Sequence, residues 1–300
     1  MHEFELLASG FGTVEGPTFD NDGNLYFSDV TGGGVRRLSP DGSIDLIVPR
    51  RRGVAGIVAH RDGGIVMSGR DLTHVRGGES RVLLGACDYA ANGLDKVTGF
   101  ADIAADWDGT ILAGSVRMAD ATQKIITTQN DGRNTIARLP GTLVRVQAVG
   151  SAQTLIEGFE GGTNGIAVTP WSERIYVAHT RAQEIVVIEP STTGPRIVTK
   201  IATGQISPVG TPDGLALDED GCLWLALHKG GLIARIGPGG ALLQTLAVPA
   251  SRVDSLCFGG RDRTDLYVVT GDNTDDPQRG GGILRTRIGV RGAPVPMAAI

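Results

Sequence analysis

Short apolar runs alternate with polar positions along the whole chain, and glycine or acidic turns separate the runs. Runs of this length, rich in β-branched residues and bounded by turn residues, predict β-strands rather than helices. The pattern also repeats: a leading residue is followed by a short apolar strand, a turn and a second strand. Copies of this unit begin at Glu15, Ala55, Ala101, Asn164, Asp213 and Asp254. A repeat of this kind predicts one supersecondary unit per copy.

Each unit contains enough residues for four strands. The second strands are predicted to open at Leu25, Ile65, Ile111, Ile175, Leu223 and Leu266. Where the turns are clearest, a third and a fourth strand follow, as in Val35–Leu38 and Ser43–Val48 on either side of a Ser-Pro-Asp-Gly turn. Proline presets φ in such a turn and glycine accepts a positive φ. Four strands per unit are typical of propeller blades.

The sequence therefore predicts an all-β fold, a six-bladed β-propeller with four-stranded blades around a central metal-binding channel. Residues 1–300 are predicted to form a single domain, because no linker interrupts the repeat. Phe4–Leu7 is predicted to supply the outer strand of the blade that begins at Asp254. The unit from Ala101 to Asn164 is the longest, and its surplus, about Met118 to Pro140, is predicted to be a loop inserted between strands.

Composition and charge agree with this fold and exclude several classes of protein. The 45 glycines disfavour a helical bundle, because an interior glycine costs a helix about 1 kcal/mol relative to alanine. A net charge of −5, without a long basic block, argues against a nucleic-acid partner or an anionic membrane surface. No apolar run is long enough to span a bilayer. Without a basic leader at the N-terminus, and with Cys87, Cys222 and Cys257 isolated, the predicted location is the cytoplasm.

The six leading residues of the units carry the candidate chemistry. The innermost strand of each propeller blade lines the central channel, so these positions are predicted to form a ring at one mouth of it. Glu15, Asn164, Asp213 and Asp254 bring oxygen ligands to that ring. Crowded carboxylates repel one another unless a cation neutralises them, and oxygen ligands suit Ca²⁺, Mg²⁺ or Mn²⁺. The alternative is that Asn-Gly and Asp-Gly at two of these positions are only turns.

Four segments of the chain resemble the SMP-30/gluconolactonase/regucalcin-like family: EGPTFDNDGNLYFSD, TNGIAV, PDGLALDEDGCLWLAL and SLCFGGRDRTDLYVVTG. The resemblance implies a six-bladed propeller with one divalent cation in its channel, held by Glu15, Asn164 and Asp213. Calcium is the first candidate, with magnesium, manganese or zinc as alternatives. Many members of the family hydrolyse lactones of sugar acids, and relatives open other esters or phosphoryl bonds.

One stretch departs from the family's pattern. Gly99-Phe100-Ala101-Asp102 stands where sugar lactonases of the family carry Arg-Phe-Asn-Asp. The missing asparagine would help to hold the metal or the substrate, and the missing arginine would contact sugar hydroxyls. We therefore expect a lactone that is less hydroxylated than a typical sugar lactone, with Asp102 or water compensating at the metal.

The expected reaction is metal-dependent hydrolysis of a small lactone or ester. A divalent cation polarises the carbonyl and stabilises the oxyanion as water attacks, and Asp213 is the candidate general base. Candidates for substrate contact are Ala101, Asp102, His179 and Asp254. The histidines lack the spacing of a helical zinc site, and no Gly-x-Ser-x-Gly motif indicates a serine hydrolase.

Two alternatives remain open at the level of sequence. The bond that is cleaved could instead be that of a phosphotriester or an aryl ester. The chain could also be a non-catalytic calcium-binding propeller, because Ala101 removes a polar group from the ring. The sequence does not predict an oligomeric state.

Overall fold

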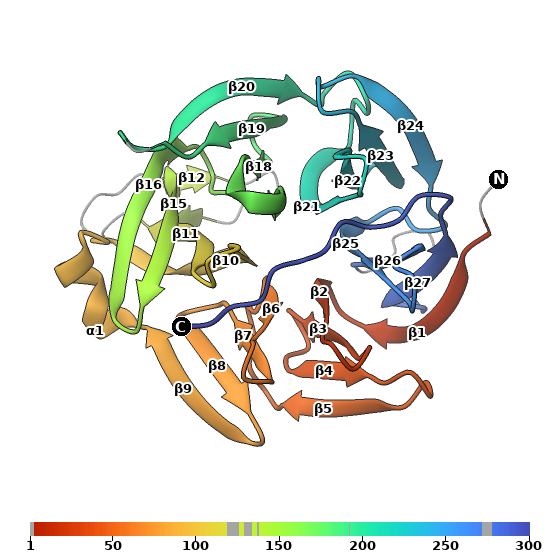
Figure 1. Cartoon of the computed structure of the whole chain (residues 1–300), viewed down its shortest axis with the longest axis horizontal. Helices are drawn as coiled ribbons and strands as arrows, with labels where there is room; N and C mark the ends of the chain where they lie inside the picture. Colours follow the sequence, from red (N-terminus) through yellow and green to blue (C-terminus); the bar gives the residue numbers. More distant parts are fainter. Residues whose placement is uncertain (1–2, 119–125, 129–133, 137, 192, 272–277) are drawn as a thin grey trace.

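Six antiparallel sheets surround a central channel in the described part of the chain, which comprises residues 3–118, 126–128, 134–136, 138–191, 193–271 and 278–300 (Figure 1). Each sheet has four strands in sequential radial order, and the third sheet has the additional short strand β14 paired with β11. This arrangement confirms the predicted six-bladed propeller.

The strands of the six blades run from the channel outward. In the first three blades they are β2 (Val14–Phe19), β3 (Leu25–Asp29), β4 (Val35–Leu38) and β5 (Ile44–Val48); β6 (Ile57–Ala59), β7 (Ile65–Met67), β8 (Leu72–Arg76) and β9 (Glu79–Leu84); and β10 (Val97–Ala105), β11 (Ile111–Met118), β15 (Gly141–Ala148) and β16 (Ser151–Phe159). In the last three they are β17 (Ile166–Val168), β18 (Ile175–His179), β19 (Glu184–Glu189) and β20 (Arg196–Ala202); β21 (Thr211–Leu217), β22 (Leu223–His228), β23 (Leu232–Ile236) and β24 (Leu242–Ala247); and β25 (Val253–Gly259), β26 (Asp265–Thr270), β27 (Gly281–Arg287) and β1 (Glu5–Phe11).

The predicted starts of the second strands agree closely with the structure. Five of them begin where the repeat places them, and β26 begins one residue earlier, at Asp265. Helical segments are short: α1 (Ala86–Tyr89), η1 (Ala90–Asn92) and η2 (Pro170–Ser172). No helix in the described residues is both long and apolar enough to cross a membrane.

The N-terminal strand closes the ring. β1 pairs antiparallel with β27, so the first strand of the chain forms the outer edge of the sixth blade. Glu5 faces Arg285 in this register, and a 2.6 Å ion pair joins their side chains. The ring is therefore closed by backbone hydrogen bonds between the first strand, β1, and the last strand, β27.

The hydrophobic core is divided among the interfaces between blades. Each of its six clusters draws residues from two neighbouring blades: Val14 with Val269, Tyr26 with Ile57, Val66 with Val144, Leu112 with Val177, Ala178 with Leu225, and Trp224 with Leu256. A blade is therefore covered on both faces, which explains why β3 and β18 are buried at every position.

Part of the insertion predicted in the third unit lies among the residues that the structure describes. A short hairpin of β12 (Ile126–Thr128) and β13 (Asn134–Ile136) lies within the predicted insertion, followed by β14 (Arg138–Leu139). The rest of the predicted loop lies outside the described residues.

The C-terminal segment crosses the channel (Figure 1), at the end where the innermost strands of the blades terminate. Ala293 donates a hydrogen bond to Leu217 at the end of β21, and Ala298 donates one to Ala59 at the end of β6. Residues 293–296 line a cavity of about 990 Å³ together with the inner strands. The two ends of the channel therefore differ: one carries the ring of leading residues and the other lies under the C-terminal segment.

Candidate metal centre

The leading residues of several units lie at irregularities of their strands. The register between the first and second strands shifts between Glu15 and Thr18 in β2, and between Pro212 and Leu215 in β21. β10 has the same break between Phe100 and Ile103. A bulge leaves a residue out of the ladder and redirects its side chain, and bulges are frequent next to functional sites. These breaks separate the ring residues from the regular alternation of the strands.

Glycines directly after the ring residues allow the inner strands to approach closely. A Cβ on Gly165 would meet the carbonyl oxygen of Asp213 at 2.4 Å, and a Cβ on Gly214 would meet the Cα of Ser255 at 2.6 Å. Neither position accepts a side chain without moving backbone. The leading residues of blades four, five and six, Asn164, Asp213 and Asp254, are consequently neighbours around the channel.

Four carboxylates converge inside the ring. Burial raises the pKa of Glu15 well above its usual value, and Asp213, Asp254 and Asp102 raise it further through charge repulsion. Burial likewise raises the pKa of Asp213, with repulsion from Asp254 and Asp102 adding to the effect. Burial also raises the pKa of Asp102 to about 7. The charged forms of these groups therefore repel one another in a poorly solvated space.

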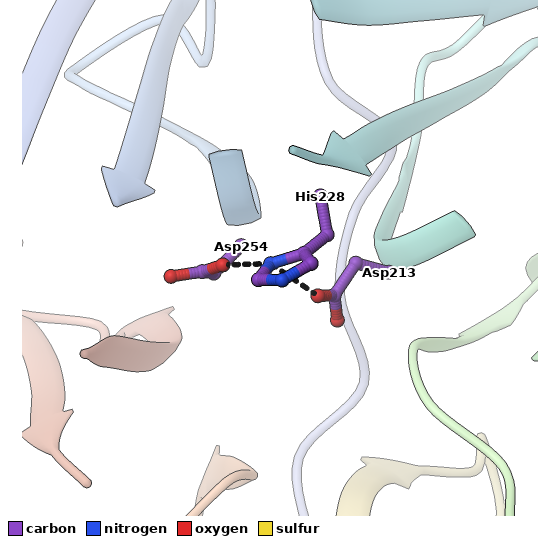
Figure 2. A group of neighbouring side chains, drawn as sticks. All are labelled: Asp213, His228 and Asp254. Atoms are coloured by element: carbon purple, nitrogen blue, oxygen red, sulfur yellow. Dashed lines mark hydrogen bonds and ion pairs between the residues drawn. The ribbon is translucent and has the colours of Figure 1, made fainter. Parts of the chain in front are cut away.

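His228 lies between two of these carboxylates, at the end of β22 (Figure 2). Its Nδ1 is 2.5 Å from Oδ1 of Asp254 and 3.7 Å from Oδ2 of Asp213. Among the residues that the structure describes, ligand atoms of these three side chains all lie within 4.8 Å of one another. The short contact to Asp254 is a hydrogen bond, since a cation between two ligand atoms holds them further apart than this.

The donor set fits a divalent cation. Oδ1 of Asp213 and Oδ2 of Asp254 are buried and have no hydrogen-bond partner in the described part of the chain. An unpartnered buried carboxylate oxygen costs free energy that a bound cation recovers. Converging carboxylates with an adjacent amide are hard oxygen donors of the kind that Ca²⁺ and Mg²⁺ prefer.

The other predicted site residues are placed as follows. Asn164 directly precedes Gly165, whose backbone packs against Asp213 and Gly214. Ala101 is half-buried beside Asp102 in β10. His179 is buried, with one ring nitrogen 3.2 Å from Glu184 and the other 3.1 Å from the carbonyl oxygen of Glu160. The structure therefore brings Glu15, Asp102, Asp213 and Asp254 together and gives His179 partners outside this group.

Two residues of the site were not singled out from the sequence. His228 follows Asp213 by 15 positions, as His179 follows Asn164, so the repeat itself marks both histidines as equivalent strand ends. Arg252 precedes the ring residue Asp254 by two positions, and its charge lowers the pKa of Asp213 against the effect of burial. Alignment of the units beyond their leading residues marks the strand end that His228 occupies, but it does not indicate that either side chain reaches the carboxylates.

The family model for the SMP-30/gluconolactonase/LRE-like region matches residues 13–272 of the chain. The chain belongs to this family. The match begins just before β2, ends just after β26 and includes each of the six ring residues, so it confirms the resemblance seen in the sequence motifs.

Two relatives match over most of their length. The chain is 27% identical over 271 residues to pentonolactonase XacC of Haloferax volcanii, covering 89% of this chain and 84% of that protein. It is 28% identical over 295 residues to 6-deoxy-6-sulfogluconolactonase of Pseudomonas putida, covering 92% and 90%. In fold it matches a calcium-binding protein, regucalcin, from Agrobacterium tumefaciens, with a TM-score of 0.77, 17% identity, and coverage of 100% of this chain and 98% of that one.

Cation binding is expected to strengthen as pH rises. In the cation-free protein, the raised pKa values of Glu15, Asp102 and Asp213 mean that the folded state holds protons that the unfolded chain releases. Stability of the cation-free protein should therefore fall as pH rises from about 4 towards 7, and a cation must displace fewer protons at higher pH. Calorimetry should give a dissociation constant for Ca²⁺ at least about tenfold lower at pH 8 than at pH 5.5.

Thermal unfolding provides the second measurement. Added Ca²⁺ should raise Tm strongly at about pH 8 and only slightly at about pH 5.5, because ligand stabilisation follows the ratio of free cation to its dissociation constant. Equal increases in Tm at the two pH values would show that these carboxylates do not bind the cation.

Proposed function

We propose that the protein is a divalent-metal-dependent lactonase. The observation that carries the proposal is the convergence of Glu15, Asp102 and Asp213 at one mouth of the channel, where a carboxylate oxygen of Asp213 has no partner among the described residues. Family membership supports a hydrolase of this type, and both full-length relatives described above are named as lactonases. Neither relative is similar enough to transfer its own substrate.

Glu15, Asn164 and Asp213 are proposed to hold the cation. The carboxylate-rich donor set favours a hard cation, and calcium is proposed because the structural relative from Agrobacterium tumefaciens is described as calcium-binding. When bound, such a cation polarises an ester carbonyl and lowers the pKa of a bound water. Asp102 supplies a further buried carboxylate on the side of the ring where Ala55 and Ala101 offer no ligand.

His228 is proposed to accept the proton of the attacking water. The hydrogen bond from its Nδ1 to Asp254 fixes the tautomer in which Nε2 carries the lone pair. No residue in the described part of the chain bonds Nε2, and the side chain is 20% exposed. This places an imidazole beside Asp213 with Nε2 facing no protein partner in the described part of the chain. The sequence-based assignment of the base to Asp213 stays a prediction, which a His228 variant can test.

The substrate is proposed to be a small lactone with fewer hydroxyl groups than a typical sugar lactone. Gly99 and Ala101 give that side of the ring no hydrogen-bonding side chain, and the neighbouring ring position is Ala55. Asp102 is the polar side chain on that side, so a lactone with several hydroxyl groups would leave some of them unpaired on binding.

Hydrolysis of a panel of γ- and δ-lactones, with and without a chelator, tests the proposal. We expect turnover that EDTA abolishes and Ca²⁺ restores, with aliphatic lactones preferred over aldonolactones. Turnover of phosphotriesters or aryl esters but of no lactone would replace the lactonase by another hydrolase. Tight cation binding without turnover of any ester would identify a binding protein instead.

A further inference from the structure

The position two residues before each ring residue carries a small side chain in five blades and an arginine in the sixth. The five small residues are Thr13, Gly53, Gly99, Gly162 and Thr211. The sixth blade has Arg252 at this place, immediately before β25. Of the six equivalent positions, therefore, only the one in the sixth blade carries a long, positively charged side chain.

Arg252 lies against the carboxylate cluster without being neutralised by an ion pair in the described part of the chain. A Cβ placed on Gly271 would lie 2.6 Å from Oδ2 of Asp254 and 3.0 Å from Nε of Arg252, so the two groups border the same small space. Nε of Arg252 is buried and has no hydrogen-bond partner among the residues that the structure describes. Arg252 as a whole residue is partly exposed.

The opposite side of the ring does not accept a guanidinium at the equivalent position. A Cβ on Gly99 would approach the carbonyl oxygen of Gly69 at 2.6 Å, because Gly69 and Phe100 form a bridge between the second and third blades. Any side chain at position 99 would therefore break this bridge. An arginine is therefore accommodated at this position in the sixth blade but not in the third.

Exposed basic residues lie in the turns and blade linkers at the end of the channel that carries the ring: Arg52, Arg70, Arg181 and Lys229. Exposed acidic residues, Asp95 and Glu160, lie in the linkers at the same end. Recognition of an anionic group is therefore assigned to Arg252 and not to the charge of the surrounding surface.

We propose that Arg252 selects lactones that carry a negatively charged substituent, such as a carboxylate or a sulfonate. This rests on the proposed lactonase function and specifies its substrate class. Glu15, Asn164 and Asp213 would hold a cation that polarises the ester carbonyl, while the guanidinium pairs with the anionic substituent from the side of the sixth blade. Arginine is suited to this role because its planar donors match carboxylate and sulfonate oxygens.

Two lactones of the same size test the proposal: a γ-butyrolactone with a carboxylate on the ring, and the corresponding neutral primary amide. Wild-type kcat/KM should be at least about tenfold higher for the carboxylate. Arg252→Gln should lower kcat/KM for the carboxylate about tenfold more than for the amide, and Arg252→Lys should restore part of the difference. Arg291→Gln, at the far end of the channel, is the matched control and should change neither value.

A loss that is equal for the two lactones would overturn the proposal, because it would place Arg252 at the reacting ester or in the fold. A wild-type enzyme that prefers the amide would overturn it as well.

A binding measurement separates failure of this proposal from failure of the lactonase proposal. The lactam analogues of the two compounds cannot be opened as lactones, yet calorimetry should still show tighter binding of the carboxylate to wild type and loss of this preference in Arg252→Gln. Equal binding of the two lactams to wild type would refute the role of Arg252 even in a protein that hydrolyses no lactone.

Discussion

Replacing Asp213 with asparagine is expected to abolish both cation binding and lactone hydrolysis. Asp213 is the proposed ligand with an unpartnered buried oxygen, and its backbone lies against the neighbouring ligand position at Gly165. Asparagine has nearly the same volume but no charge, so packing is retained while the strongest electrostatic attraction for the cation is removed. Loss of an electrophile of this kind should lower kcat/KM by at least roughly a thousandfold.

Stability should move in the opposite direction in Asp213→Asn. Without a cation, the charge of Asp213 repels those of Asp254 and Asp102. This repulsion is absent from the variant, because asparagine carries no charge. The chelated variant should therefore unfold at a Tm equal to or above that of chelated wild type at about pH 8. Asp22→Asn, in an exposed turn at the far end, serves as the control. Ca²⁺ affinity of Asp213→Asn within about threefold of wild type would contradict the ligand assignment.

The fold was predictable from the sequence because each blade of a propeller corresponds to one repeat along the chain. Strand starts such as Leu25 and Ile175 follow from short-range patterns that recur in each unit. Contacts within a blade are between consecutive strands, so little long-range information was needed. The pairing of β1 with β27 joins the two ends of the chain, and the repeat indicates it by leaving the last blade one strand short.

The site was predictable only in part. Glu15, Asp102, Asp213 and Asp254 share the leading position of the repeat or its neighbour, and that position alone predicts a common location on the channel. His228 and Arg252 reach the same place from other positions, at the end of a second strand and in a blade linker. Their proximity to the carboxylates depends on how side chains turn at bulges and linkers, which residue spacing does not specify.

His179 illustrates the limit of the repeat. It occupies the same strand end in blade four that His228 occupies in blade five. Glu184 and the carbonyl oxygen of Glu160 engage its two nitrogens, whereas His228 meets Asp254. Equivalent backbone positions therefore carry different chemistry because the residues offered by the neighbouring strands and linkers differ.

Replacing His228 with asparagine should remove hydrolysis while leaving the cation bound. The amide nitrogen of asparagine can take the place of Nδ1 and donate to Asp254, whereas nothing takes the place of Nε2. The hydrogen bond that orders the site is thereby kept and the proposed proton acceptor is lost. We expect kcat to fall by about 10² to 10⁴-fold, the range typical of a lost general base, with Ca²⁺ affinity within about threefold of wild type.

A second variant, and the size of the loss in the first, distinguish the two candidate bases. Asp254→Asn should lower kcat as well, because an amide at this position no longer fixes the tautomer that leaves Nε2 free. If His228→Asn keeps kcat within about threefold, the imidazole is not the base, and Asp213 becomes the remaining acceptor beside the cation.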